Sequence, residues 1–346
     1  MAYSNINKPN EYFNTRPYTG DGNSSQAITG VGFAPDFVWI KKRTGGAATG
    51  HKLLDTVRGN NLAIESSSTD AELENTVNPN QTSFDSDGFT TGNNGGVNLN
   101  GSTYVSWNWL AGGTASSNTD GSITSTVSAN TTAGFSIVSY TGTASAQTVG
   151  HGLGTTPSMI IVKNRDAAEN WGVWHNLLDA DEYLGLNQTN AIAVNTAIWN
   201  NTLPTSNVFS VGNNARTGSS ADFIAYCFAE KKGFSEFGSY RGNGSTDGTF
   251  IYTGFKPAYF MIKRTDTTGS WIIHDNKRSF YNVTSNDLYA NLSDLEVSGN
   301  RFDFVSNGVK LRNNFTNMNA SGGIYIYMAF AESPLVAGNY VPTTAR

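Results

Sequence analysis

The chain has 346 residues and a formal net charge of −5, with 12% aromatic and only 14% charged residues. Charged residues make up about 25% of an average soluble protein, whereas here Ser, Thr, Asn and 37 glycines take their place. Lys and Arg form no basic run to attract nucleic acid or an anionic membrane, and no apolar stretch approaches the ~18 residues that a membrane span needs.

Along the chain, the first strong pattern is an aromatic strand that ends in Tyr-x-Gly. It occurs three times, at Tyr18-Thr19-Gly20, Tyr140-Thr141-Gly142 and Tyr240-Arg241-Gly242. Each is followed by a proline turn and an apolar strand that reaches a lysine six residues after the proline, at Lys41, Lys163 and Lys263. A histidine then follows in each copy, at His51, His175 and His274, and an aromatic strand closes each copy, at 104–109, 223–228 and 325–330.

The spacing of these landmarks indicates duplication. The prolines of the first and second copies are 122 residues apart, and those of the second and third are 100 apart. The other landmarks keep nearly the same offsets and the same order. The sequence therefore predicts three divergent copies of one unit of roughly one hundred residues.

Short apolar or alternating runs bounded by Gly, Asn, Asp and Pro are typical of β-sandwiches. We therefore expect an all-β chain of three tandem, self-sufficient β-sandwich-like domains with little helix. Their predicted ranges are 1–111, 133–232 and 233–346, the last with a C-terminal tail, and residues 112–132 are predicted to be a Gly/Ser/Thr-rich linker. The first copy is expected to hang more loosely than the other two. Asp87-Gly88 and Asn307-Gly308 predict hairpin turns, and residues 68–74 could form a short helix.

Motifs for chemistry are scarce. The sequence has no Gly-x-Ser-x-Gly elbow, His-Glu-x-x-His pair or phosphate loop. Asp85-Ser86-Asp87-Gly88 resembles the start of a calcium loop but lacks the bidentate glutamate, so a hairpin turn is favoured. We predict no catalytic residue, no metal site, no cofactor and no enzymatic activity. The single cysteine, Cys227, lies in an apolar run and is predicted to be a buried small hydrophobe.

Two sets of repeated residues remain as candidates. The histidines are interpreted as structural, each satisfied by a neighbouring carboxylate or carbonyl, although they could converge on one ion if the copies met around an axis. The lysines and nearby arginines could contact an acidic glycan or partner, or could instead blunt a sheet edge or pair locally with Asp166 and Asp266. Trp171 and Trp271 each follow a polar loop and could stack on a sugar, with core packing as the alternative. The candidate contacts are Trp171, Trp271, Lys163, Arg165, Lys263 and Arg264.

Three short sequence segments resemble a known group of proteins. Residues 253–257 (Thr-Gly-Phe-Lys-Pro), 262–266 (Ile-Lys-Arg-Thr-Asp) and 319–332, which end in Tyr-Met-Ala-Phe-Ala-Glu, resemble a repeat domain of uncharacterised structural proteins of marine tailed bacteriophages. The resemblance extends from Tyr12 onward. It implies a virion surface protein of the tail-fibre-like kind and brings no catalytic residues with it.

Three functions stay open at this point. The first is a tail fibre or receptor-contacting appendage; the second is a capsid decoration protein (a head fibre or cement protein). The third is an enzyme or binding protein acting on surface polysaccharide. The expected location is the virion, since residues 1–5 lack the features of a signal peptide. Expected partners are other virion proteins and a host surface glycan, with neither nucleic acid nor membrane insertion. A homo-oligomer is expected, and a trimer is favoured because virion positions are symmetric.

Overall fold

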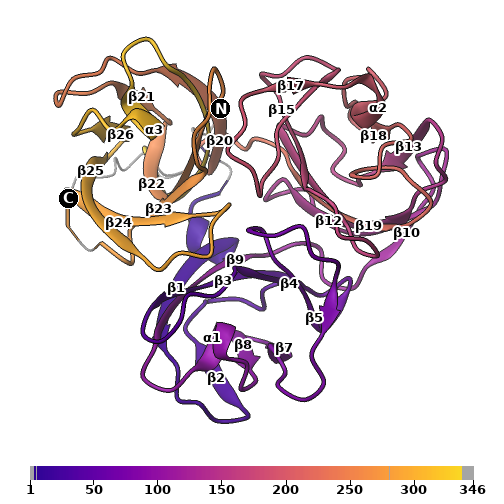
Figure 1. Cartoon of the computed structure of the whole chain (residues 1–346), viewed down its shortest axis with the longest axis horizontal. Coiled ribbons are helices and arrows are strands. Elements are labelled where there is room, and N and C mark those ends of the chain that lie inside the picture. Colours follow the sequence, from indigo (N-terminus) through magenta and orange to yellow (C-terminus); the bar gives the residue numbers. More distant parts are fainter. Residues whose placement is uncertain (1–3, 5, 280, 337–346) are drawn as a thin grey trace.

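The computed structural model describes residues 4, 6–279 and 281–336. The fold is all-β, with 45% strand and 5% helix, which confirms the predicted class. The strands form three lobes that meet at a common centre (Figure 1), here called units 1, 2 and 3 in chain order. Every pairing between named strands is antiparallel and stays within one unit. No helix of the described residues is long and apolar enough to cross a membrane.

Unit 1 has a six-stranded sheet in the order β1-β9-β3-β4-β5-β6, covered by a three-stranded sheet β2-β8-β7. The hairpin predicted at Asp87-Gly88 is confirmed, because β7 and β8 pair up to Asp85 and Gly88. The elements are η1 (Pro9–Glu11), β1 (Phe13–Thr19), β2 (Gln26–Thr29), β3 (Phe37–Thr44), β4 (Lys52–Asp55), β5 (Gly59–Ile64), β6 (Leu73–Glu74), β7 (Gln81–Asp85), β8 (Gly88–Thr91), α1 (Gly95–Asn98) and β9 (Thr103–Trp109).

Unit 2 has a six-stranded sheet in the order β10-β11-β12-β19-β14-β15 and two small two-stranded sheets, β13-β18 and β16-β17. Its elements are β10 (Ser116–Asn118), β11 (Ser125–Asn130), β12 (Phe135–Thr141), β13 (Gln147–Gly150), β14 (Met159–Asn164), β15 (Gly172–His175), β16 (Glu182–Tyr183), β17 (Ala193–Val194), α2 (Thr196–Trp199), β18 (Val208–Val211) and β19 (Asp222–Phe228).

Unit 3 is a nearly closed, barrel-like sheet of eight strands in the order β20-β27-β22-β23-β24-β25-β26-β21. The hairpin predicted at Asn307-Gly308 is confirmed between β25 and β26. The elements are β20 (Ser235–Arg241), β21 (Phe250–Tyr252), β22 (Phe255–Arg264), β23 (Ile272–Asp275), β24 (Thr284–Tyr289), β25 (Val297–Val305), β26 (Gly308–Leu311), α3 (Thr316–Asn319) and β27 (Ile324–Pro334). The end of the predicted C-terminal tail, 337–346, lies outside the described residues.

Three expectations about local structure are wrong. Residues 112–132 are not a linker, because β10 and β11 lie within them and extend the sheet of unit 2 through β12. Residues 68–74 form no helix; their backbone turns toward unit 2, where the amide of Glu72 bonds the carbonyl of Arg165 at 2.8 Å. Unit 1 does not hang loosely, because its aromatic side chains pack against both other units.

The repeated Tyr-x-Gly pattern has a physical reason. Each tyrosine hydroxyl donates a hydrogen bond of 2.7–2.8 Å to a carbonyl just before the last strand of its unit, at Val97, Thr217 or Met318. The chain then passes so close to itself that a Cβ on Gly142 would lie 2.2 Å from the carbonyl oxygen of Ser219. Only glycine fits at this approach.

Gly142→Ala is therefore expected to lower the free energy of unfolding by at least about 1–3 kcal/mol, the range for overpacking a well-packed site. Urea denaturation followed by tryptophan fluorescence measures it. Gly95→Ala is the matched control, because a Cβ there meets no atom within 4 Å. Equal midpoints for the two variants would contradict this explanation of the repeat.

The three units share one core. In each unit the last strand pairs with the strand that ends in Tyr-x-Gly and with the proline-led strand, in the orders β1-β9-β3, β12-β19-β14 and β20-β27-β22. This common register brings Trp109, Phe228 and Phe330 to the centre, with ring centroids 5.7–6.2 Å apart in all three pairs. All three rings are buried. The expectation of self-sufficient domains is therefore wrong in this respect: each unit completes its own sheets but buries one sheet face against the other two.

Candidate functional site: the seams between the units

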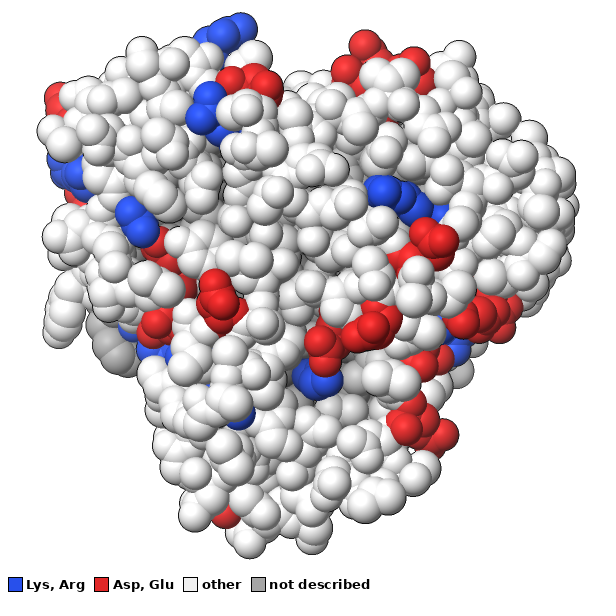
Figure 2. Space-filling view, in the orientation of Figure 1, with Lys and Arg blue, Asp and Glu red and all other residues white. Residues whose placement is uncertain are grey.

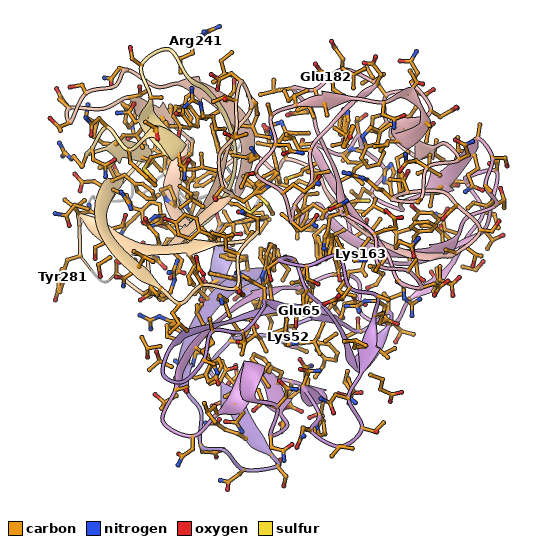
Figure 3. The ribbon with its side chains drawn as sticks, viewed as in Figure 1. Lys52, Glu65, Lys163, Glu182, Arg241 and Tyr281 are labelled. Carbon is orange, nitrogen blue, oxygen red and sulfur yellow. The ribbon has the colours of Figure 1, made fainter. Side chains whose placement is uncertain are left out.

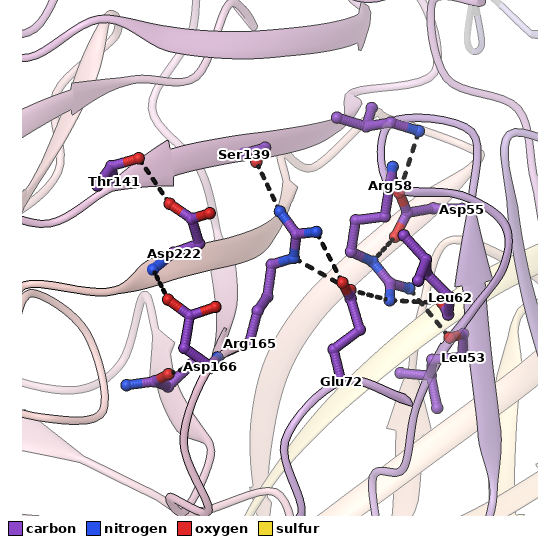
Figure 4. Close-up of polar contacts among 12 residues, drawn as sticks. Leu53, Asp55, Arg58, Leu62, Glu72, Ser139, Thr141, Arg165, Asp166 and Asp222 are labelled. Carbon is purple, nitrogen blue, oxygen red and sulfur yellow. Dashed lines mark hydrogen bonds and ion pairs between the residues drawn. The ribbon is translucent and has the colours of Figure 1, made fainter. Parts of the chain in front are cut away.

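Polar side chains cross between the units along three seams, and two of these carry buried ion pairs. In the seam between units 1 and 2, Arg58 Nε bonds Asp55 Oδ2 at 2.6 Å, and Arg58 Nη1 bonds Glu72 Oε2 at 2.9 Å (Figure 4). From unit 2, Arg165 forms a two-pronged pair with Glu72, at 3.0 and 2.7 Å. Arg58 and Asp55 have no exposed side-chain surface. The Glu72 carboxylate thus joins an arginine of each unit.

Tyr226 of unit 2 completes this network. Its hydroxyl donates to Asp55 Oδ2 at 2.8 Å and accepts a hydrogen bond from Arg58 Nη2 at 3.2 Å. Arg58 Nη2 also bonds the Leu53 carbonyl at 3.0 Å. With the Leu62 carbonyl, 2.7 Å from Nη1, five polar groups satisfy the Arg58 guanidinium, as a buried charge requires.

The seam between units 3 and 1 repeats the arrangement with other residues. Arg278 Nε bonds Asp275 Oδ2 at 2.6 Å, and Arg278 Nη1 bonds Glu296 Oε2 at 2.9 Å. Arg43 of unit 1 contributes both prongs to Glu296, each at 2.8 Å. Trp107 Nε1 of unit 1 donates to Asp275 Oδ2 at 3.0 Å, where Tyr226 stands in the first seam.

The seam between units 2 and 3 has the same backbone contact without the charges. The amides of Glu72, Ile192 and Glu296 donate to the carbonyls of Arg165, Thr265 and Arg43, at 2.8, 3.0 and 3.0 Å. Ile192 and Thr265 therefore replace the glutamate and arginine of the other seams. His175 and Leu178 stand in the places of aspartate and arginine, because His175 pairs with Met159 as Asp55 pairs with Phe37 and Asp275 with Tyr259.

Electrostatics favour the ionised forms of the seam carboxylates. Burial alone would raise the pKa of Glu72, but its hydrogen bond from Arg165 and the charge of Arg58 hold it below the ordinary value. Burial opposes ionisation of Asp275 as well, and the Arg278 charge outweighs it, so that this pKa is lowered. Both networks are therefore charged around neutral pH.

The repeated lysines tie each unit to its neighbour. Lys41, Lys163 and Lys263 donate to the carbonyls of Ser293, Thr69 and Thr189, at 2.7, 3.1 and 3.2 Å. These carbonyls lie three residues before Glu296, Glu72 and Ile192, so the three bonds are equivalent. All three lysines are buried, and Lys163 lies where units 1 and 2 meet, whereas Glu182, Arg241 and Tyr281 lie at the periphery (Figure 3).

These lysines predict a pH dependence. Burial lowers the pKa of each of Lys41, Lys163 and Lys263 to about 8. Between pH 8 and the unfolded value of about 10.4, the unfolded chain binds more protons than the folded one, so stability rises with pH. We expect the urea midpoint to increase from pH 8 to about 9.5, below the range in which tyrosines ionise.

The thiol of Cys227 opposes this trend, because burial raises its pKa and the unfolded thiol ionises first. The measurement therefore uses a Cys227→Ala background. Lys163→Met in that background should reduce the slope in part, because burial also lowers the pKa of Lys41, Lys263, Lys42 and Lys231. An unchanged slope would show that Lys163 does not titrate as described.

Trp171 and Trp271 also lie in the seams. Each donates its indole N–H to a carbonyl of the preceding unit, at Glu65 (3.0 Å) and Gly185 (2.9 Å). His51 has the same role in unit 1, with Nε2 2.9 Å from the Tyr289 carbonyl and Nδ1 accepting from Trp39 at 2.8 Å. The true repeat partners of His51 are thus these two tryptophans.

The prediction that His51, His175 and His274 occupy equivalent positions is therefore wrong, although each does face a carbonyl or carboxylate. His175 Nε2 lies 3.3 Å from the Tyr327 carbonyl, and His274 Nε2 lies 2.9 Å from Asp287 Oδ1. Burial lowers the pKa of all three histidines. Within the described residues, no three His, Cys, Asp or Glu side chains come together as a metal site would require.

The prediction of a glycan contact at the surface is wrong for four of the six residues. Lys163, Lys263, Trp171 and Trp271 are buried in the seams. Arg165 pairs with Glu72, and its side chain keeps 18% exposure. Arg264 is one residue out of register with Arg43 and Arg165, and pairs locally with Asp266. The buried Cys227 is confirmed.

Sequence reasoning missed the Asp-x-x-Arg pairs at 55–58 and 275–278. Their signal is visible in the sequence, since both repeat at an offset of 220 residues. Figure 2 shows charged side chains both along the boundaries between the lobes and at the outer rims of units 2 and 3, while the outer flank of unit 2 is almost uncharged in this view.

In comparisons with known proteins, residues 8–334 match a family model described as a domain of unknown function (DUF7483). No curated protein matches the chain.

Proposed function

We propose that this chain, which belongs to the DUF7483 family of unknown function, is a bacteriophage virion structural protein of the tail-fibre or receptor-contacting kind. The observation that carries the proposal is the closure of the ring. Unit 1 contacts unit 2, unit 2 contacts unit 3, and unit 3 returns to unit 1 through the same backbone bond each time. Such a body is stiff, and it presents loops outward from a fixed centre.

Three further observations support a structural rather than a catalytic role. The buried ionisable groups of the seams pair with each other and with backbone carbonyls. The same roles recur in different seams, whereas catalysis would need only one active site. Charged residues make up only 14% of the chain, and the outer flank of unit 2 is almost uncharged in the view of Figure 2. The phrases at 253–257, 262–266 and 319–332 resemble virion proteins of marine tailed phages.

In finer terms, we propose that each unit is one divergent copy of an ancestral β-sandwich of roughly one hundred residues, and that the chain assembles with other virion proteins as a homo-oligomer, with a trimer favoured. Light scattering of the purified protein measures the oligomeric state.

The test of the function is to locate the protein on intact virions by cryo-electron microscopy. We expect density for the three-lobed body on the tail. Density on the capsid lattice would overturn the tail assignment in favour of a decoration protein, and absence from the virion would overturn the structural role. Release of oligosaccharides from host polysaccharide by the purified chain would overturn the non-catalytic proposal.

A further inference from the structure

Backbone geometry singles out one place on unit 2. Among the described residues, three that are not glycine have a positive φ: Ala144 at 57°, Asn200 at 51° and Asn201 at 45°. All three line the same surface cavity, of about 310 Å³. Residues held in sparsely populated backbone regions cluster at ligand sites.

Ala144 is the informative member of this set. It lies two residues after Gly142, and the corresponding positions of units 1 and 3 are Gly22 and Gly244, with φ of 73° and 69°. Glycine adopts this region freely, whereas an L-residue with a Cβ does so at a cost. Ala144 is also exposed, so its methyl group adds nothing to the core. Unit 2 therefore has a methyl group at this position of the cavity, whereas units 1 and 3 have glycine at the corresponding positions.

The opposite wall comes from the end of α2. Asn200 ends this helix in the left-handed region, and Asn201 follows it. The helix can lie against the end of β18 because Gly212 has no side chain: a Cβ there would lie 2.3 Å from the Ala197 carbonyl oxygen. This packing sets the exposed Asn200 and Asn201 across the cavity from the loop at 144–146.

The lining has one chemical character. It offers the amides of Asn200, Asn201 and Asn213, the hydroxyls of Ser145 and Thr196, and alanine methyl groups. Amides and hydroxyls supply both donors and acceptors, and none of the lining residues is ionisable. A charged ligand would lose hydration here without meeting a countercharge, whereas the hydroxyls and C–H faces of an uncharged sugar match this lining. The volume is within the range of small-ligand sites.

We propose that this cavity binds a neutral saccharide unit. The inference deepens the receptor-contacting role and rests on it for its biological meaning, while the binding itself is a property of the purified chain.

The experiment is saturation-transfer NMR and titration calorimetry of the full chain with glucose, galactose, mannose and N-acetylglucosamine, and with glucuronic acid as the charged comparison. We expect at least one neutral sugar to bind and glucuronic acid to bind more weakly. The Asn200→Gly/Asn201→Gly double variant removes both amides and keeps the backbone region that glycine favours. It should weaken binding by about tenfold or more, the equivalent of one or two hydrogen bonds, with little change in Tm.

Two further variants separate binding from folding. Asn23→Gly, in the corresponding loop of unit 1, should leave binding unchanged. Ala144→Gly should weaken binding while its Tm stays the same or rises by about 1–3 °C, because strain is relieved. Binding of none of the four neutral sugars, or unchanged binding by the double variant, would overturn the site. Neither result would alter where the protein lies on the virion, so the two proposals fail independently.

Discussion

Arg58→Met is expected to lower the free energy of unfolding by about 3–5 kcal/mol, the cost of breaking a buried ion pair by removing one partner. Arg58 and Asp55 are fully buried. Without the guanidinium, Asp55 keeps only the Tyr226 hydroxyl and backbone amides, and Glu72 keeps only Arg165. The expected loss of stability comes from the buried carboxylates left without their guanidinium partner, and not from a cavity, because methionine fills much of the same volume.

Urea denaturation at neutral pH measures this loss. Arg264→Met is the control, since Arg264 pairs with Asp266 at the partly exposed rim and should cost at most about 1 kcal/mol. If the two variants had the same midpoint, the buried network would not hold the seam as described.

A transplant sharpens the test. The seam between units 2 and 3 has uncharged residues at the same positions, including Met328 at the position of Tyr226. This set can be copied into the first seam as D55H, R58L, E72I, R165T and Y226M. Because this replacement leaves no unpaired buried charge, it should cost less than Arg58→Met alone, although it changes five residues. A larger loss for the transplant would mean that the two seams are not interchangeable.

Trp109→Ala is the second large effect, with an expected loss of about 3–5 kcal/mol for an aromatic side chain truncated in a core. Trp109 is 1% exposed. It contacts two aromatic rings of unit 2, Phe135 and Phe228, and two of unit 3, Tyr259 and Phe330. The cavity would therefore open at the point where all three units meet. Loss of stability should appear in every unit, not only in unit 1.

Thermal unfolding with peptide-resolved hydrogen exchange measures both the size and the reach of this effect. Leu203→Ala is the control, because its side chain is 52% exposed and the change should stay within about 0.5 kcal/mol. Faster exchange confined to residues 9–109 would contradict a shared core.

Local features of the fold could be predicted from the sequence because they depend on neighbouring residues. The hairpins at Asp87-Gly88 and Asn307-Gly308 follow from the dipeptides themselves, because Asp-Gly and Asn-Gly favour the positive φ angles of a tight hairpin turn. The Tyr-x-Gly endings recur because each copy makes the same close approach. The strand β27 carries apolar side chains on both faces, and the central core buries one face while the core of unit 3 buries the other.

The seams could not be predicted in the same way, because these contacts between units join residues that are 73 or more positions apart in the sequence. The aspartate–arginine pair survives in only two copies, so a search for landmarks present in all three passes over it. The histidines misled for the opposite reason: His51, His175 and His274 lie within two residues of a common offset, yet the strand register separates them. Residues 112–132 show that a Gly/Ser/Thr-rich composition also suits strands near a sheet edge, because β10 is the edge strand and β11 lies between it and β12.

The most direct measurement is native-state hydrogen exchange of the unmodified chain, read separately for peptides of units 1, 2 and 3 as denaturant is added. A ring closed by equivalent seams and one aromatic centre should open as a whole, so the most protected amides of the three units should share a single opening free energy. Three distinct values, with one unit opening while the other two stay protected, would show that the units are independent domains joined in series.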